Sequence, residues 1–136
     1  MNTEQPKHEF HIIDGKAIAE EILLGIRKKI VESKIIPGLA VVMAGDDEPS
    51  KLYVRNKKKA CLKVGMNFHK YFCNLETEDQ IIEMIRFLNN DPTVSGIIVQ
   101  LPLPKHLNTK KIIDAIDPKK DADGFHPKNI EKILAG

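Results

Sequence analysis

The sequence predicts an α/β domain with three layers, in which helices cover both faces of a mostly parallel sheet. Three short runs, "GLAVVMAG", "MNFHKYFCN" and "SGIIVQ", indicate strands, and the first and third are apolar throughout, as in strands buried within a parallel sheet. Segments with apolar residues at helical spacing alternate with these runs. Ligands bind beyond the carboxyl ends of strands in such sheets, so we expect a site at the loops "GDDEPS" and "QLPLP".

The N-terminal part predicts an arm followed by a helix. Residues 1–11 are polar and are expected to form a flexible arm ahead of one domain spanning 12–136. Asp14 can cap a helix that carries an apolar stripe with a period of four residues. The stripe consists of Ile18, Ile22, Ile26 and Ile30, widened by Ala19 and Leu23.

The stretch "SKLYVRNKKKACLKVG" predicts a helix with an unusual inner face. Ser50 is expected as its N-cap and Gly65 as its end. Lys57 is the one charged residue on the side that carries Tyr53, Ala60, Cys61 and Val64. Two interpretations are open: Tyr53 and Lys57 meet over a ligand, or the tyrosine packs on the core and the lysine extends past it into solvent.

The remaining helices are predicted from local signals. Thr77 and Gln80 can form a capping box that begins a helix running through Leu88, and Pro92 follows its end. A short helix is expected over 109–116, followed by the charged turn "DPKKDADGFHP".

The composition predicts a cytoplasmic globular protein. No apolar run approaches the roughly 18 residues that span a membrane, and the N-terminus lacks the apolar core of a signal peptide. A net charge of +2 is too small to indicate nucleic acid by itself. Cys61 and Cys73 lack metal-ligand spacing and the histidines are scattered, so we expect reduced cysteines and no metal.

Several residues after the third strand can belong to a site or merely shape the loop. Gln100 can contact a ligand or cap the sheet edge, and its spacing alone favours the cap. Pro102 and Pro104 stiffen the exit from the strand, and the sequence leaves their cis or trans state open. Asp121 and Asp123 are of the type that commonly forms turns.

Four segments together resemble the bifunctional methylenetetrahydrofolate dehydrogenase/methenyltetrahydrofolate cyclohydrolases. They are "IIDGKAIAEEI", "VVMAGDDEPSKLYVRNKKKACLKVGM", "GIIVQLPLPKHL" and "IDPKKDADGFHPKNI", in the family's order. Family members continue into a Rossmann domain with a Gly-rich NADP loop, and the 136 residues contain no such loop. The chain therefore resembles the folate-binding N-terminal domain.

The resemblance implies roles for individual residues. Tyr53 matches the tyrosine that stacks on the folate, Lys57 the catalytic lysine that assists proton transfer, and Gln100 the glutamine that orients this lysine. Ser50, Leu101 and Pro102 match positions that line the same cleft.

A carboxylate that binds the pterin is also implied. Asp123 matches it, because the family carboxylate stands immediately before the glycine that is Gly124 here. Asp121 is expected instead to cap the turn or to pair with a surface lysine, so that its loss should barely change folate binding.

The implied reaction belongs to one-carbon metabolism. In the full enzyme, 5,10-methylenetetrahydrofolate is oxidised with NADP, and water then opens the methenyl product to 10-formyltetrahydrofolate, a donor for purine biosynthesis. The chain alone is expected to bind reduced folates, to lack dehydrogenase activity and to retain at most weak cyclohydrolase activity. A homodimer is implied for the full-length enzyme, with no nucleic-acid or membrane partner.

Two other functions compete with this one. Short-chain dehydrogenases also carry Tyr-x-x-x-Lys on a helix, but they place a Gly-rich nucleotide loop well ahead of it, and "GDDEPS" stands there instead. A small nucleic-acid-binding module is the second alternative, because the stretch from Lys51 to Lys63 holds six basic residues and no acidic one. Its weak points are the small net charge and an aromatic content of 5%.

Overall fold

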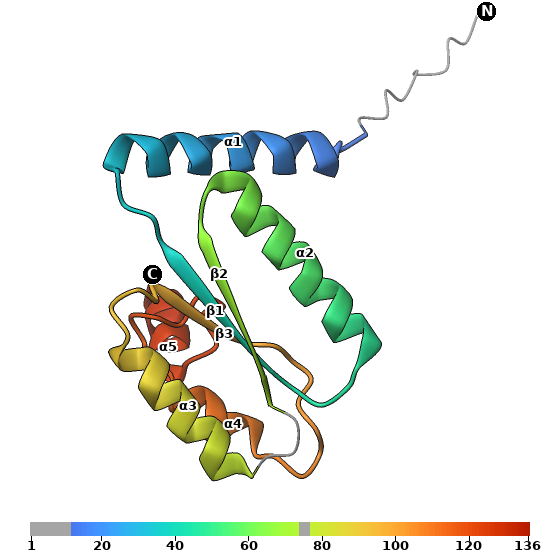
Figure 1. The fold of residues 1–136 in the computed structure, drawn as a ribbon, viewed down its shortest axis with the longest axis vertical. Coiled ribbons are helices and arrows are strands. Elements are labelled where there is room, and N and C mark those ends of the chain that lie inside the picture. Colours follow the sequence, from blue (N-terminus) through green and yellow to red (C-terminus); the bar gives the residue numbers. More distant parts are fainter. Residues whose placement is uncertain (1–11, 74–76) are drawn as a thin grey trace, which may run out of the picture.

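The computed structural model describes residues 12–73 and 77–136 (Figure 1). The predicted arm over 1–11 lies outside the described residues, as does Asn74 at the end of the second predicted strand. Along the chain the elements are α1 (Gly15–Ser33), β1 (Gly38–Ala44), α2 (Glu48–Val64), β2 (Asn67–Cys73), α3 (Glu78–Asn90), β3 (Gly96–Val99), α4 (Thr109–Asp114) and α5 (Pro127–Ala135).

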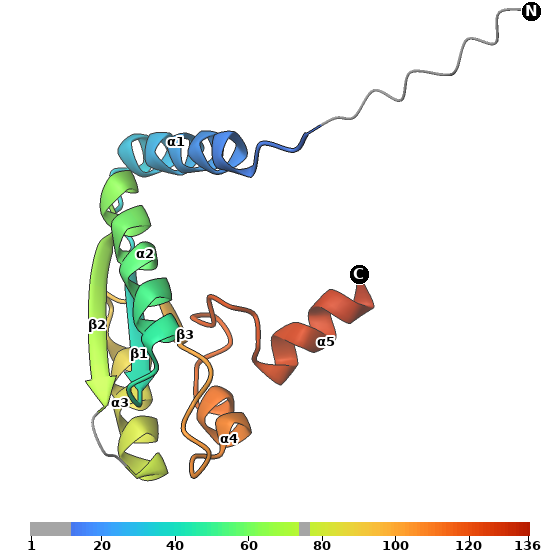
Figure 2. The same ribbon diagram turned by 90° about the vertical axis from the view of Figure 1, so that its right-hand side faces the viewer.

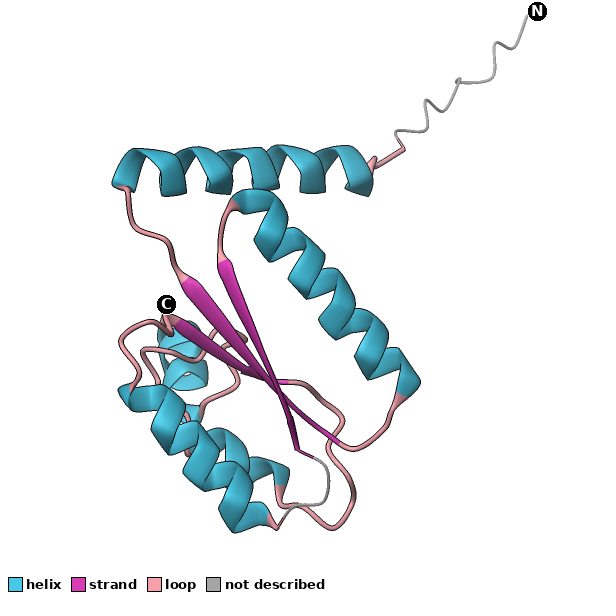
Figure 3. Ribbon diagram, viewed as in Figure 1, coloured by secondary structure: helices cyan, strands magenta, loops and turns pink. Residues whose placement is uncertain are grey.

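The described strands form one sheet in the order β2-β1-β3, and both pairings are parallel (Figure 3). In the centre, Val42 of β1 is opposite Tyr71 of β2 and Val99 of β3. Apolar side chains suit both faces of β1, because helices cover both, and residues 40–43 are at most 1% exposed. The predicted α/β class is confirmed.

Two apolar clusters fill the space between the sheet and its helices. On one face, Val41 and Met43 pack with Val54 of α2. On the other face, Val42 belongs to a larger cluster with Ile85 of α3 and Ile112 of α4. Figure 1 shows α2 on one side of the strands and α3 with α4 on the other. The three predicted layers are therefore present.

Local capping chemistry fixes the predicted starts of α1 and α3. Asp14 accepts a hydrogen bond from the backbone N–H of Ala17 at 3.0 Å. Thr77 and Gln80 form the predicted capping box, in which each side chain bonds to the backbone of the other residue.

The predicted N-cap of α2 is wrong by three residues. Asp47 caps this helix, and its carboxylate accepts from the backbone N–H of Ser50 at 2.8 Å. Pro49 lies in the first turn, where a backbone N–H has no partner within the helix, so the lack of this group in proline costs no hydrogen bond. Ser50 is consequently inside the helix and buried. Gly65 ends the helix in the left-handed conformation, as predicted.

The terminal helices bury little of their apolar surface. The stripe of α1 is present, but Ile18 and Ile22 are 48% and 57% exposed, and α1 lies across one end of α2 (Figure 1).

Helix α4 ends at Asp114, two residues before the predicted end. Helix α5 was not predicted, although Pro127 at its first turn and Ile130, Ile133 and Leu134 at helical spacing were signals for it. Figure 2 shows α5 pointing away from the sheet, with the C-terminus at its end.

Candidate functional site

A cleft lies beside the carboxyl end of β3, at the edge where the sequence predicts a site. Its volume is about 340 Å³, within the range of small-molecule sites. Helix α2, the loop after β3 and the loop before α5 supply its lining, which consists of Tyr53, Lys57, Gln100, Leu101, Asp123 and Phe125.

The unusual lysine of α2 is held by a glutamine. The Nζ of Lys57 donates to Oε1 of Gln100 at 2.9 Å, and the amide nitrogen of Gln100 donates to the carbonyl oxygen of Leu101 at 3.0 Å. The backbone N–H of Gln100 continues the pairing with β1 by donating to Val42 at 2.9 Å. A nearly buried side chain on a rigid strand end thus orients the ammonium group toward the cleft.

Two further residues that were expected to line the cleft, Ser50 and Pro102, lie outside its lining. Ser50 is 3% exposed, and its hydroxyl donates to the carbonyl oxygen of Leu101 at 3.4 Å. It therefore ties the first turn of α2 to the loop after β3. Pro102 follows Leu101 through a cis peptide bond, which settles the alternative that the sequence leaves open for this proline.

Tyr53 stands at the mouth of the cleft, one helical turn before Lys57, and 60% of its surface is exposed. An exposed ring at a cleft edge can stack on a planar ligand. Phe125 lines the same cleft and is 49% exposed. Sequence reasoning missed Phe125, although an aromatic residue directly after the "DG" of the turn was a signal for it.

Asp123 brings a carboxylate to the cleft that contains Lys57. Although the residue is exposed as a whole, partial burial of its carboxyl group raises the pKa of Asp123 above the ordinary value; the positive charge of Lys57 opposes this rise and the negative charge of Asp121 adds to it. A partly desolvated carboxylate at a cleft is suited to accept hydrogen bonds from a ligand.

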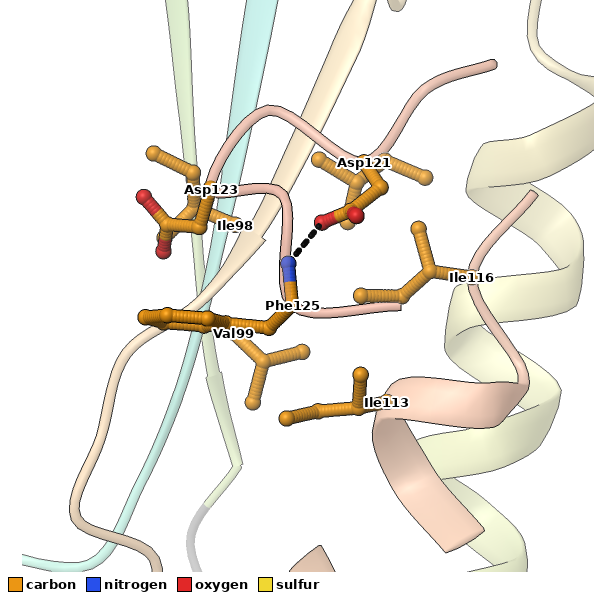
Figure 4. A pocket seen from close by; sticks show the side chains of 8 residues that line it. Ile98, Val99, Ile113, Ile116, Asp121, Asp123 and Phe125 are labelled. Carbon is orange, nitrogen blue, oxygen red and sulfur yellow. Dashed lines mark hydrogen bonds between the residues drawn. The ribbon is translucent and has the colours of Figure 1, made fainter. Parts of the chain in front are cut away.

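Asp121 faces the opposite way, into its own loop. It accepts from the backbone N–H groups of Gly124, Phe125 and His126 at 3.1, 3.3 and 2.9 Å, and from the side chain of Asn129 at 2.9 Å. Figure 4 shows its carboxylate turned toward the loop, while the Asp123 carboxylate lies on the other side, near the Phe125 ring. Asp121 therefore caps the turn, one of the two roles expected for it.

The bonds of Asp121 also set its charge state. Burial acts to raise the pKa of Asp121, but the hydrogen bonds from Asn129 and the backbone N–H groups outweigh it and hold the pKa below the ordinary value. A cavity of only about 10 Å³ lies between this loop and the apolar residues Ile113 and Ile116 (Figure 4).

Neither a metal centre nor a membrane span is found in residues 12–73 and 77–136. No three histidine, cysteine, aspartate or glutamate side chains in that part of the chain gather where they could hold an ion. Across the same described ranges, no helix is long and apolar enough to cross a bilayer.

Comparison with known proteins places the chain in a family. Residues 13–123 match the sequence profile of the tetrahydrofolate dehydrogenase/cyclohydrolase catalytic domain. The bifunctional protein FolD of Geotalea daltonii is 49% identical over 129 residues, which cover 92% of this chain and 46% of that protein. The FolD protein of Magnetococcus marinus is 44% identical over 131 residues, covering 93% and 46% of the two chains.

Solved structures agree with the sequence comparison. A 5,10-methylenetetrahydrofolate dehydrogenase from the silkworm Bombyx mori superposes with a TM-score of 0.89 at 39% identity, covering 93% of this chain and 46% of the silkworm chain. The methylenetetrahydrofolate dehydrogenase-cyclohydrolase of Trypanosoma brucei, solved with NADP and an inhibitor, gives 0.83 at 30% identity, covering 90% and 43%. The chain spans about half the length of these relatives. It belongs to the tetrahydrofolate dehydrogenase/cyclohydrolase family, and its matched residues are those of the family's catalytic domain.

Proposed function

We propose that this chain binds reduced folates in the cleft of Lys57 and Asp123 and supplies the catalytic half of a methylenetetrahydrofolate dehydrogenase/cyclohydrolase. The observation that carries the proposal is the Lys57–Gln100 pair at 2.9 Å, in the same cleft as Asp123 and Tyr53. A planar, nitrogen-rich ligand satisfies all of these groups, because it offers a face for stacking and ring N–H donors for a carboxylate.

Each residue has a separate task in the proposed reaction. Tyr53 stacks on the ligand, and Asp123 accepts hydrogen bonds from the pterin edge. Lys57, oriented by Gln100, places its ammonium beside the one-carbon bridge and assists proton transfer there. In the hydrolytic step water adds to the bridge carbon of the methenyl cation and one C–N bond breaks, so that the carbon remains on the other nitrogen as a formyl group. Of the two protons of the water, one ends on the released nitrogen and the other is lost to solvent.

The dehydrogenase activity, the dimer and the cytoplasmic location are proposed for the whole protein. Relatives about twice as long as this chain leave room for an NADP-binding Rossmann domain and support that part of the proposal. The 136 residues contain no Gly-x-Gly-x-x-Gly loop, so they do not fit a site for this nucleotide, and no step through NADP is assigned to them.

The charges of α2 argue against the nucleic-acid alternative. Lys51 pairs with Asp46 and Glu48, and Lys63 pairs with Glu20 of α1. Lys57 faces the cleft rather than the outer surface. Half of the six basic residues in this stretch are thus in ion pairs or face the cleft. Only three remain to bind a phosphate backbone.

Binding of a stable reduced folate to a Tyr53→Ala variant tests the proposal. We expect 5-formyltetrahydrofolate to bind the wild-type chain saturably in isothermal titration calorimetry and about tenfold more weakly to Tyr53→Ala, because stacking area is lost. Leu52→Ala is the matched control, since Leu52 neighbours Tyr53 in the chain, is exposed and lies outside the cleft lining. Oligonucleotide binding that is steeply salt-dependent, with no folate binding, would contradict the proposal.

A further inference from the structure

The loop that carries Asp123 is attached to the sheet immediately before it reaches the cleft. The backbone N–H of Ile97 in β3 donates to Lys120 at 2.6 Å, and the N–H of Ala122 donates back to Ile97 at 3.2 Å. These two bonds form a parallel bridge between Ile97 and Asp121. The backbone on the near side of Asp123 is therefore fixed by the central core.

The backbone on the far side of Asp123 has a different support. Gly124 adopts a left-handed conformation, with φ of 73°, and the chain turns there. The N–H groups of Gly124, Phe125 and His126 all donate to the carboxylate of Asp121, so one side chain holds three consecutive residues of the turn. Without it, these donors would have to find other partners.

The same carboxylate connects the turn to α5. Asn129, in the first turn of this helix, donates to Asp121 at 2.9 Å and also to the carbonyl oxygen of Pro118 at 2.8 Å. His126, the N-cap of α5, is buried and accepts from the N–H of Lys128 at 3.1 Å. Asp121 is thus the point at which the sheet, the turn and α5 meet.

We propose that Asp121 is a positioning residue, which acts through the turn at 124–126 to direct the carboxylate of Asp123 into the cleft. The proposal rests on the function proposed above. In an extended segment the side chains of Asp121 and Asp123 would point to the same side. The turn separates them, so that one carboxylate holds the backbone while the other faces the ligand (Figure 4). This replaces the expectation that loss of Asp121 barely changes folate binding.

A double-mutant cycle distinguishes positioning from a merely structural role. Affinity for 5-formyltetrahydrofolate and the free energy of unfolding are measured for the wild type, Asp121→Asn, Asp123→Ala and the double variant. Asp121→Asn keeps the size of the side chain but removes its charge and one acceptor. We expect it to weaken binding about tenfold in the wild-type background and less than about twofold in the Asp123→Ala background, because its effect passes through Asp123.

The free energy of unfolding shows how far each variant is destabilised, and the affinities in the two backgrounds show whether Asp121 acts through Asp123. If Asp121 only stabilises the fold, the loss of affinity is the same in both backgrounds, and that result overturns the proposal. An unchanged affinity for Asp121→Asn also overturns it. Failure of the wild-type chain to bind the folate would instead refute the proposed function, so the two failures are distinguishable.

Two more variants keep the test decisive. Asn129→Ala removes one of the four bonds to Asp121, and if Asp121→Asn does not fold, the same cycle with Asn129→Ala decides, with a smaller loss that again depends on Asp123. Asp117→Asn is the matched control, since Asp117 caps a neighbouring turn by accepting from the N–H of Lys119 at 2.9 Å and lies outside the cleft lining. It should leave the affinity unchanged, and a loss equal to that of Asp121→Asn would overturn the proposal.

Discussion

Lys57 shows how one side chain on the inner side of a helix marks a site. A long cation in this position has to reach solvent or find a partner, and Gln100 provides that partner at the end of β3. The interpretation in which the lysine merely extends past a packed tyrosine is disfavoured, because Tyr53 is itself exposed at the mouth of the cleft.

The role of Lys57 can be tested by removing its charge at nearly constant shape. We expect Lys57→Met to abolish hydrolysis of 5,10-methenyltetrahydrofolate above the rate in buffer, and to leave the free energy of unfolding nearly unchanged. Lys58→Met is the control, because Lys58 is the next residue and is exposed on the outer side of α2. Absorbance of the methenyl group follows the reaction. Hydrolysis by Lys57→Met at the wild-type rate would refute the assignment.

The two aspartates of the turn should affect stability in opposite directions. The pKa of Asp121 is lowered in the folded chain, so its charged form stabilises the fold above the ordinary pKa of about 3.9, and this stability is lost as the pH falls through the folded value. The pKa of Asp123 is raised, so its charged form costs stability at neutral pH, and this cost disappears as the pH falls below the ordinary value.

Urea unfolding between pH 3 and pH 7 measures both effects. At pH 7, Asp121→Asn should lower the free energy of unfolding by about 1–3 kcal/mol, because charged hydrogen bonds are lost. Asp123→Asn should raise this free energy at pH 7. Both differences from the wild type should shrink as the pH falls. Changes of the same sign at pH 7 would show that the electrostatic account of the turn is wrong.

At the scale of elements, most of the fold could be predicted because its signals are local. The uninterrupted apolar run of β1 and the caps of α1 and α3 depend on neighbouring residues alone. The start of α2 was misplaced because "DDEPS" offers both Asp47 and Ser50 as caps, and only the fold shows that Ser50 is needed to bond Leu101. Helix α5 was missed although Pro127 and the helical spacing of Ile130, Ile133 and Leu134 were local signals for it.

The site could be predicted only in part, for a similar reason. Lys57 was conspicuous because it interrupts an apolar face, whereas Asp123 and Gln100 were indicated by resemblance rather than by their spacing. The several bonds of Asp121 depend on the left-handed turn at Gly124, which brings N–H groups distant in an extended chain to one carboxylate. A sequence pattern does not show where the chain folds back on itself in this way, so these hydrogen bonds could not be predicted.

Replacing two glycines by alanine should change the free energy of unfolding in opposite directions. A Cβ on Gly38, at the start of β1, would lie 2.2 Å from the carbonyl oxygen of Thr93, so Gly38→Ala should lower the free energy of unfolding by about 1–3 kcal/mol. Gly25, inside α1, has nothing within 4 Å of such a Cβ, so Gly25→Ala should raise it by about 0.5–1 kcal/mol. Urea unfolding of both variants checks this. Equal effects would contradict the close contact of Gly38 with the loop before β3.

At the scale of the whole molecule, the cleft and the redox reaction are expected to be separable. The chain carries the cleft, and its 136 residues contain no Gly-rich nucleotide loop. We therefore expect the purified chain to bind reduced folate yet to produce no NADPH, followed by its absorbance, from NADP and 5,10-methylenetetrahydrofolate. Formation of NADPH that depends on this chain would contradict the separation.

Titration of the wild-type chain and Asp123→Ala with 5-formyltetrahydrofolate tests the central claim, that the cleft at the carboxyl end of the sheet is a folate site. Charged hydrogen bonds to a ligand contribute about 1.5–3 kcal/mol each, so Asp123→Ala should weaken binding at least about tenfold. The control Asp114→Ala removes an exposed ion pair with Lys110 at 2.7 Å and should leave the affinity unchanged. Saturable binding that Asp123→Ala does not weaken, or no binding by the wild-type chain, would contradict the claim.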